Sequence, residues 1–348
     1  MHHLCHQFGY SPELTATIIF HIFWCVYVRI VIYFSIFEFN VVEKAEFSNH
    51  LYHPKYWLLW LGIGITRLTQ LLPLTMQMKL GAIIGRLAKK IMGRRVNTAR
   101  RNLELCFPNM GQEEQNQLLN QNFEETGKAI FDTVNAWWWS DDKIQRHMSI
   151  TGQQHVEQTL NDGHGVILFA VHCLPLEMGA RIFGQFQPGI GVYRPHNNPV
   201  IEYLQVKGRL RSNKALVPKR DLRQMVRCLR NPDVIWYTAD QDFGRSSAAF
   251  IPFFAMQDAA TITGATTLAR LGKAKVLPFR VERNADDNGY SIEISPPLDD
   301  FPTKDEIEDA KRGNGIIEQI INKNRPQYMW LHRRFKTRPH QDDPSVYK

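Results

Sequence analysis

The sequence predicts an α/β protein: a mixed, largely parallel sheet flanked by helices, preceded by an N-terminal membrane-anchoring helix. Two observations lead to this prediction. From Gly165 onward, short β-rich runs alternate with helical segments, and this alternation is typical of a parallel sheet. Ahead of that region lie two apolar stretches, of which the first is long enough to cross a bilayer.

The composition is that of a globular protein with a basic balance. The 348 residues are 44% hydrophobic and 22% charged, with a formal net charge of +8. This charge favours an anionic partner such as phospholipid, a phosphorylated substrate, an acidic protein or nucleic acid. The five cysteines are scattered and contain no CxxC pair, which fits neither a disulfide framework nor a zinc site. We therefore expect the folded part to lie in a reducing compartment.

The first apolar stretch covers 21 residues, Thr17 to Phe37, and has Arg29 near its middle. It is too long for the apolar part of a signal peptide, and no small-residue cleavage site follows it. The charge of Arg29 adds a cost to membrane insertion. The stretch nevertheless has the length of a bilayer span.

The second apolar stretch, Tyr56 to Pro73, is interrupted by Arg67. It is predicted to span the bilayer or to lie in the interface, and the alternative is a buried core helix. Six basic residues and no acidic one follow between positions 79 and 95, which places the remainder on the cytoplasmic side. The expected parts are an N-terminal extension (1–50), a membrane anchor (51–80) and a cytoplasmic domain (81–348).

The elements of the cytoplasmic domain follow from periodicity. A polar helix is predicted from Gly111 to Ser140; it ends in three tryptophans, which are most simply packing residues. The predicted strands are VILFAV, GIGVY, VIWYT and KVLPFRV, and the helices between them cover 175–183, 199–211, 221–229 and 261–271. The segment ERNADDNGYSIEI predicts a hairpin with DDNG as its turn, and two helical segments are expected to close the chain.

A candidate catalytic pair lies in the segment VHCLPLEMG. His172 ends an apolar strand, where open α/β sheets present ligand-binding residues. Pro175 favours a helix start, so Glu177 falls in the first helical turn and is expected to reach back to the imidazole. A carboxylate on one ring nitrogen leaves the other free as a general base. The alternative interpretation is a satisfied, partly buried histidine and a helix-terminal charge; Cys173 is a weaker candidate nucleophile.

Basic and polar segments downstream of this pair favour an anion-binding function. Nine basic residues against one acidic residue lie between Lys207 and Arg230. In VYRPHNNP, Asn197 or Asn198 is expected to cap the helix that Pro199 begins. In ADQDFG, the two aspartates are metal ligands or a loop network; without a phosphate motif we favour the network. The closing segment WLHRRFKTR is interpreted as a basic helix near a membrane surface.

Taken together, these segments resemble the lipid A biosynthesis late acyltransferases, most closely the lauroyl branch acting on the Kdo-bearing precursor. The resemblance covers about His53 to Pro339 and rests on HPKYW, VHCLPLEMG, YRPHNNP, GRLRSNKAL, ADQDFG with FIPFF, and PQYMWLHRRFKTRP. It implies a glycerolipid acyltransferase-like fold and transfer of a fatty acyl chain from acyl carrier protein to a hydroxyl of an acyl chain on the glucosamine disaccharide. Related glycerolipid acyltransferases usually carry aspartate in place of Glu177.

The resemblance also implies a bacterial inner-membrane enzyme whose catalytic domain faces the cytoplasm, with inner-membrane lipids and the lipid A precursor as partners. No cofactor, metal or nucleic acid is expected. The segment from Met1 to about Asn40 does not match the family, and we expect translation to begin near Val41. The substrate-binding residues are expected in the matched segments: Arg194, Asn198, Arg211, Asn213, Asp240, Asp242 and Gly244.

In the expected mechanism, His172 takes the proton of the acceptor hydroxyl as its oxygen attacks the thioester, and Arg209 stabilises the oxyanion. Phe250, Phe253 and Phe254 are expected to line an apolar groove or to pack in the core. The alternatives are a myristoyl-type enzyme of the same pathway, a thioesterase using the same His172 and Glu177, and a non-catalytic basic adaptor at the membrane.

Overall fold

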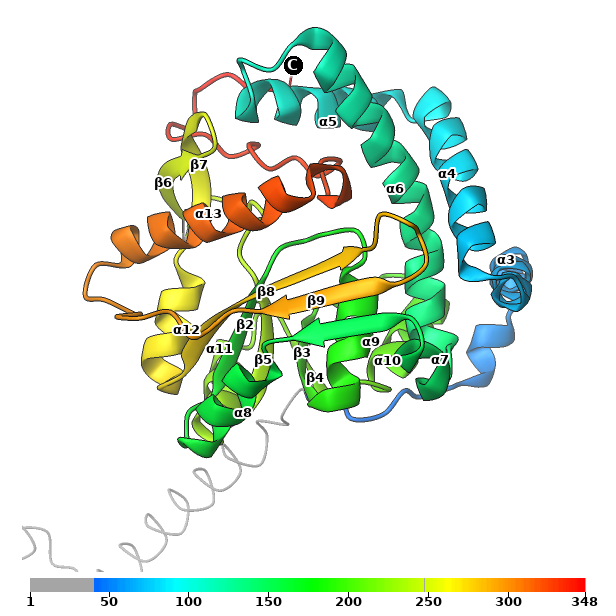
Figure 1. Ribbon diagram of the computed structural model, residues 1–348, viewed down its shortest axis with the longest axis horizontal. Helices are drawn as coiled ribbons and strands as arrows, with labels where there is room; N and C mark the ends of the chain where they lie inside the picture. Colours follow the sequence, from blue (N-terminus) through cyan, green and yellow to red (C-terminus); the bar gives the residue numbers. More distant parts are fainter. Residues whose placement is uncertain (1–40, 247, 348) are drawn as a thin grey trace, which may run out of the picture. The chain divides into compact units, whose positions relative to one another are not determined.

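The computed structural model describes residues 41–246 and 248–347. The predicted apolar span from Thr17 to Phe37 lies outside the described residues. Within them, a seven-stranded sheet has the order β1-β9-β8-β2-β5-β3-β4 (Figure 1). All neighbouring pairs are parallel except β8 with β9, as the sequence predicts. The strands are β1 (Met148–Thr151), β2 (Val166–Ala170), β3 (Gly189–Tyr193), β4 (Asn213–Pro218), β5 (Val234–Thr238), β8 (Lys275–Arg283) and β9 (Tyr290–Ile294).

The central strand β2 shows why the sheet could be recognised from the sequence. All five of its residues are buried, because helices cover both faces of an interior parallel strand. The four predicted strands are confirmed as β2, β3, β5 and β8. Strand β4 was not predicted, since its sequence NKALVP begins with a polar and a charged residue and ends in proline.

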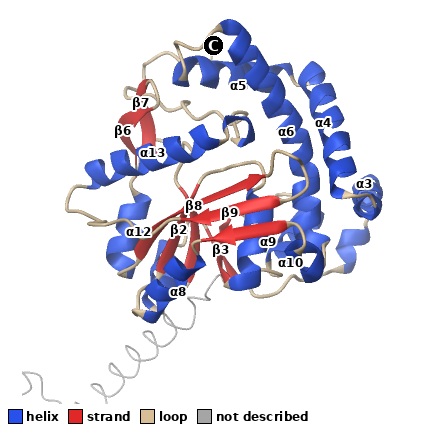
Figure 2. Cartoon of the chain, viewed as in Figure 1, coloured by secondary structure: helices blue, strands red, loops and turns tan. Residues whose placement is uncertain are grey.

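Helices connect the strands on both faces (Figure 2). Right-handed crossovers place the helices after β2 and β3 on one face and the helix after β4 on the other, because the strand order reverses there. The predicted helix from Thr261 starts later, because Thr261 and Ile262 belong to β7 (Met256–Ile262), which pairs with β6 (Ala248–Phe253). The helices are α8 (Gln153–Asn161), α9 (Leu176–Phe186), α10 (Pro199–Arg209), α11 (Leu222–Arg230), α12 (Gly264–Gly272) and α13 (Glu306–Lys323).

A helical layer precedes the sheet in the chain. Its long member α6 confirms the predicted polar helix, and α4 lies along it at close range (Figure 1). Glycines permit this approach: a Cβ on Gly85 would lie 2.0 Å from the carbonyl oxygen of Phe123. The layer consists of α3 (Trp57–Leu68), α4 (Leu74–Ile91), α5 (Gly93–Cys106), α6 (Gln112–Trp138) and α7 (Asp141–Gln145).

The predicted anchor is not a spanning helix in the described part of the chain. Helix α3 has 12 residues and ends before Pro73, and none of the described helices is long and apolar enough to cross a membrane. Instead α3 and α4 expose apolar side chains at helical spacing, because their other faces pack on the protein. This exposed row, the apolar stripe, consists of Trp57, Leu58, Leu61, Ile65, Leu68, Met76, Leu80, Ile83, Leu87 and Ile91.

The predicted hairpin is confirmed, since β8 and β9 pair in antiparallel fashion around the turn DDNG. A buried polar network holds it to α6: the Arg283 guanidinium is paired with Asp132, and the Tyr290 hydroxyl donates to the same carboxylate over 2.7 Å. Burial acts to lower the pKa of Arg283, but the carboxylates of Asp132 and Glu125 outweigh it and raise that pKa. The hairpin is therefore fixed to the helical layer by charge as well as by apolar contact.

The closing segment contradicts the prediction of a basic helix. After α13, only a short 3-10 turn (Arg325–Gln327) is helical, and residues 331–338 form turns. The reason is that their polar groups have partners elsewhere. Buried Arg334 donates to the carbonyl of Ala260 and, over 3.0 Å, to the Thr261 hydroxyl. The backbone N–H of Thr337 donates to Asp242 over 2.7 Å. The segment is thus fixed to the rest of the protein, with Arg334 and Phe335 buried and Lys336 exposed.

Candidate active site

The residues after four parallel strands meet at one edge of the sheet. His172 follows β2, Asp240 follows β5, Arg194 follows β3 and Lys219 follows β4. Parallel strands bring their carboxyl ends to the same edge, which is where open α/β sheets bind ligands. The sequence therefore places chemically active side chains where the topology gathers them.

The imidazole of His172 is paired with Asp240. Its Nδ1 lies 2.8 Å from Asp240 Oδ1, and the backbone N–H of His172 donates to the same carboxylate over 3.1 Å. Strand register explains the pairing: Ala170 is opposite Thr238, so the residues two positions further along each strand face each other. The two partners come from positions 68 residues apart.

The second ring nitrogen of His172 points to a hydroxyl. A carboxylate only accepts hydrogen bonds, so Nδ1 carries the proton and Nε2 has the free lone pair. Nε2 lies 3.3 Å from the hydroxyl oxygen of Thr238. The His172 side chain is 21% exposed, so solvent or a substrate hydroxyl can reach it. A neutral imidazole in this state is able to accept a proton.

The surroundings of Asp240 favour its ionised form. It is 1% exposed, and burial acts to raise its pKa, but the charge and hydrogen bonds of His172 outweigh burial and lower that pKa. Tyr328 is close enough to feel this carboxylate, since burial and then the charge of Asp240 raise the pKa of its hydroxyl. Asp240 therefore acts as a fixed negative charge beside the imidazole. Asp240 was predicted to bind substrate, which stays a prediction; its contact to His172 was not predicted.

The predicted contact between Glu177 and His172 is wrong. Glu177 lies in the first turn of α9, as expected from Pro175, but its carboxylate is bound by Arg209 and by the indole N–H of Trp137 over 3.1 Å. Asp240 already occupies the Nδ1 side of the imidazole. Trp137, one of three predicted packing residues, is thus a site residue that the sequence did not reveal.

Arg209 ends α10 and donates from Nε to Glu177 Oε1 over 3.0 Å. Burial acts to raise the pKa of Glu177, but Arg209 outweighs it, and the pKa is lowered. Burial acts to lower the pKa of Arg209, and Glu177 in turn raises it. The pair is ionised, and the arginine is held by its carboxylate in one orientation. Arg209 uses Nε and Nη2 to bind Glu177, and its Nη1 can donate to an anionic oxygen.

Cys173 is no candidate nucleophile in this structure. The side chain is buried at 7% exposure, and burial, followed by the nearby Asp240, raises the pKa of its thiol. A thiol held in its protonated form is a poor nucleophile. This agrees with the low weight given to it from the sequence.

The other predicted site residues fall into structural and exposed positions. Asn198 caps α10 by accepting from Val200 N–H over 3.0 Å, as predicted. Asn213 is buried and donates to the carbonyl of Arg209 over 2.8 Å. Arg211 donates to the carbonyl of Trp137 over 2.8 Å. Asn213 and Arg211 therefore hydrogen-bond the backbone of Arg209 and Trp137, the two residues that bind Glu177. Direct substrate contact by Asn213 or Arg211 stays a prediction.

The segment ADQDFG forms the loop network that the sequence favoured. Asp242 accepts from the Thr337 hydroxyl and from the Gly244 N–H over 2.8 and 2.9 Å. Gly244 has a φ of +97°, a conformation that favours glycine. The network fixes the closing segment against the loop that carries Asp240.

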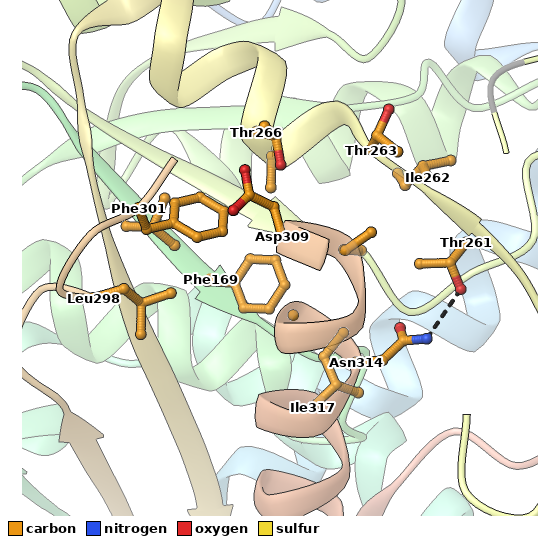
Figure 3. A pocket seen from close by; sticks show the side chains of 15 residues that line it. Phe169, Thr261, Ile262, Thr263, Thr266, Leu298, Phe301, Asp309, Asn314 and Ile317 are labelled. Carbon is orange, nitrogen blue, oxygen red and sulfur yellow. Dashed lines mark hydrogen bonds between the residues drawn. The ribbon is translucent and has the colours of Figure 1, made fainter. Parts of the chain in front are cut away.

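The cavity beside Phe169 and Ala239, at the ends of β2 and β5, is small, whereas a hollow of about 800 Å³ opens beside Tyr193 at the end of β3. The cavity in Figure 3 has a volume of about 10 Å³ and is lined by residues such as Phe169, Thr266 and Ile317. That volume suits one water molecule and not an acyl chain. Of the predicted groove residues, Phe253 is fully buried and packs on Phe335, while Phe254 packs on Phe107 and Trp330. Core packing is therefore the role of Phe253 and Phe254.

Comparison with known proteins gives a consistent result. The profile of the family described as bacterial lipid A biosynthesis acyltransferase matches residues 44–337. A lipid A biosynthesis lauroyltransferase of Escherichia coli K12 is 44% identical, over 88% of this chain and 100% of the relative. A lipid A biosynthesis acyltransferase of Haemophilus influenzae Rd is 45% identical over 88% and 98%, respectively. A lipid A biosynthesis palmitoleoyltransferase of E. coli K12 is 40% identical over 85% and 96%.

Proposed function

Because this chain belongs to the family of bacterial lipid A biosynthesis acyltransferases, we propose that it transfers a lauroyl chain from acyl carrier protein to the Kdo-bearing lipid A precursor. The acceptor is a hydroxyl of an acyl chain already on the precursor. The chain is an acyltransferase, and a lipid A precursor is its acceptor class. The lauroyl assignment is supported by the 44% identity to the lauroyltransferase.

The single observation that carries the reaction type is the His172–Asp240 pair at the sheet edge. In the proposed mechanism Nε2 of His172 takes the proton from the acceptor hydroxyl while its oxygen attacks the thioester carbonyl. The C–O bond forms and the C–S bond breaks. The imidazolium then returns the proton to the leaving thiolate, so the products are an ester and the free thiol of the carrier. No acyl-enzyme is needed, because the nucleophile belongs to the substrate.

Glu177 and Arg209 have a separate role in this proposal. Glu177 positions the guanidinium of Arg209, and Arg209 stabilises the negative charge that develops on the thioester oxygen. The ion pair supports this role because it fixes the cation before the substrate arrives. In this proposal His172, paired with Asp240, and Glu177, paired with Arg209, both contribute to the attack on the thioester.

We propose that the enzyme works at the cytoplasmic side of the bacterial inner membrane. The apolar stripe supports this location: Leu58 is 82% exposed, Leu61 61% and Leu68 65%, all on one face of α3. Such a face, together with the basic residues of α4, suits a helix lying in the headgroup region of anionic lipid. In this proposal the described helices lie on the membrane surface, where the lipid acceptor is.

The carrier protein is proposed to dock on basic residues of α11. Arg223, Arg227 and Arg230 are exposed on this short helix, and the sequence around it is depleted in acidic residues. Such charges mostly accelerate association with an acidic partner. The docking proposal depends on the donor being a carrier protein, and the next experiment tests that dependence.

The test is a transfer assay with purified enzyme, the Kdo-bearing precursor, and carrier protein loaded with lauroyl, myristoyl or palmitoleoyl chains, followed by mass spectrometry. The expected result is one added lauroyl chain. Preferred transfer of palmitoleate would favour the activity named for the 40% identical relative instead. Release of free fatty acid without transfer would identify a thioesterase and refute the proposal.

A further inference from the structure

Four cationic side chains gather beside the candidate active site. Arg194, Lys219, Arg220 and Lys336 are all exposed, and we call this group the cation cluster. In the part of the chain that the structure describes, none of the four forms an ion pair with a carboxylate, in contrast to Lys214, which is paired with Asp233. Like charges repel, so an unneutralised group of this kind has an energetic cost that an anionic ligand would remove.

The backbone fixes two of the four cations side by side. Tyr193 and Pro218 are opposite each other at the ends of the parallel strands β3 and β4, so Arg194 and Lys219 are the next residues in register. The N–H of Lys219 donates to the carbonyl of Tyr193 over 2.8 Å, which extends the pairing by one position. Sheet register therefore determines where these two charges lie.

Lys336 arrives from the closing segment of the chain. Its neighbour Thr337 is bound to Asp242 through both its N–H and its hydroxyl, over 2.7 and 2.8 Å. These bonds hold Lys336 next to the loop that follows β5. Because these hydrogen bonds fix the backbone beside Lys336 before a ligand arrives, binding an anion requires little further ordering of this part of the chain.

Three neighbouring cations act on Lys219. Partial burial lowers its pKa, and the neighbouring Arg194, Arg220 and Lys336 lower it further. Two carboxylates lie near the cluster, and both are directed to other partners: Asp242 accepts from Thr337 and Gly244, and Asp221 accepts from the N–H of Gln224 at the start of α11. Among the described residues neither forms an ion pair with a member of the cluster, so four cations face two carboxylates and the local excess of charge is positive.

An aromatic side chain and the catalytic histidine adjoin the cluster. Phe243 is 44% exposed, and the ammonium nitrogen of Lys219 lies 4.8 Å from its ring centroid. His332 lies in the same closing segment as Lys336, and burial, followed by the charges of His172 and Lys336, lowers the pKa of its imidazole. Through Lys219 the cluster thus contacts the loop that carries Asp240, the partner of His172.

We propose that the cation cluster is a binding site for a phosphate ester of one of the two substrates. The oxygens of a phosphate group can accept hydrogen bonds from several ammonium and guanidinium groups at once. This matches cationic side chains that come together from the ends of two strands and from a loop. The exposed Phe243 gives an apolar wall for the part of the substrate next to the phosphate. Two sources carry this chemistry, the phosphorylated lipid acceptor and the phosphopantetheine arm of the donor. The choice between them rests on the proposed function; the phosphate site itself does not.

Direct binding tests the site without turnover. Thermal unfolding of the full chain is measured in inorganic phosphate and in chloride at equal ionic strength, since a ligand that binds the folded state raises the midpoint. The expected result is a rise for the wild type and for the control Lys311→Gln, an exposed lysine paired with Glu308 on α13. The double variant Lys219→Gln/Lys336→Gln should lose that rise. An equal rise in all three proteins would overturn the proposal.

Kinetics then identify the source of the phosphate. The KM is measured for the precursor with and without its phosphates, and for acyl-phosphopantetheine against acyl-pantetheine. Loss of two charge-assisted contacts should raise the KM for the phosphorylated form of one substrate by about 10-fold or more, with no change for its phosphate-free form. Equal KM changes for both forms of both substrates would overturn the assignment. Absence of all transfer would count against the proposed function alone.

Discussion

At the scale of single residues, two carboxylates have separate partners where a single carboxylate was expected: Asp240 is buried and Glu177 is half-buried. The HxxxxE spacing suggested that Glu177 would orient His172, because both lie around the same strand-to-helix turn. In the structure, Asp240 holds the imidazole and Glu177 holds Arg209. Orientation of the base and placement of the cation are thus separate functions that can be removed separately.

Replacing His172 by alanine should lower the turnover number by about 100- to 10,000-fold, the range that a general base contributes. Asp240→Asn should have a comparable effect, because an amide no longer fixes the proton on Nδ1. The acidic limb of the kcat/KM profile should also move to lower pH in this variant, since a negative charge beside the imidazolium is lost. Steady-state kinetics from pH 5 to 9 measure both.

Asp242→Asn is the matched control, because this aspartate is equally buried in the same loop but binds Thr337 and Gly244. It should change the unfolding midpoint and leave the position of the acidic limb unchanged. An unshifted limb in Asp240→Asn, or a shift of the same size in Asp242→Asn, would remove Asp240 from its positioning role.

The Glu177–Arg209 pair predicts a pH-dependent stability. The pKa of Glu177 in the folded state lies below its ordinary value of 4.5, so its contribution is complete well above that pH and is lost as pH falls through the folded-state pKa. Glu177→Gln should lower the free energy of unfolding at pH 7 by about 2 kcal/mol, since it removes one partner of a mostly buried charged pair. Urea unfolding at several pH values should show this difference shrinking below about pH 4.5.

The control for this effect is Glu124→Gln, which breaks the exposed pair with Arg86 on the helical layer. Exposed pairs contribute about 0 to 1 kcal/mol, so its effect should be near the lower limit of detection. A difference between wild type and Glu177→Gln that stays constant from pH 7 to 3 would mean that packing, and not charge, accounts for the loss.

At the scale of elements, the strands and helices that could be predicted are those with a clear hydrophobic period or a helix-starting residue in the sequence. The buried apolar runs of β2, β3, β5 and β8 gave the sheet, and Pro199 with Asn198 gave the start of α10. The closing segment was not predictable, because its conformation depends on long-range partners of Arg334 and Thr337. The pairing of His172 with Asp240 depends on strand order, although the equal distance of both residues from their strand ends is a signal in the sequence.

The apolar stripe of α3 and α4 predicts membrane binding without a span. Gly81 and Gly85 let one face of α4 pack closely on α6. The opposite, apolar face of α4 is not covered by any other described element. Leu61→Gln/Ile65→Gln should reduce co-sedimentation with anionic vesicles by about 10-fold or more, because each large apolar side chain contributes about 1.5 kcal/mol or more when buried. Circular dichroism should be unchanged, since both side chains are more than half exposed.

A matched pair of exposed apolar residues lies outside the stripe. Leu271 on α12 is 44% exposed and Ile307 on α13 is 50% exposed. Leu271→Gln/Ile307→Gln should leave vesicle binding as in the wild type. Equal binding losses in the two double variants would point to general surface hydrophobicity and end the argument for a specific membrane face.

At the scale of the whole molecule, the net charge of +8 predicts a salt-dependent encounter with an acidic carrier. Raising ionic strength should raise the KM for acyl carrier protein more than it lowers the turnover number, and Arg223→Glu should reproduce part of that effect at low salt. Arg209→Ala should instead lower the turnover number itself, by about 100-fold if it stabilises the oxyanion. A salt-independent KM would argue against docking by the basic residues of α11.

The hydrogen bonds of the closing segment also impose an order in time. The carbonyl of His172 accepts from the N–H of Met329 over 3.1 Å, and the N–H of Leu174 donates to Gln327 over 2.8 Å. At about 5–20 residues per second, a ribosome synthesises Gln327 and Met329 roughly 10 to 30 seconds after His172. The nascent chain can complete its sheet strands first, yet the turn bearing the base stays without its anchors until residues 327–337 have emerged. A product ended by a premature stop codon in α13 would carry His172, Asp240 and Arg209 and still lack the fixed geometry that acyl transfer needs.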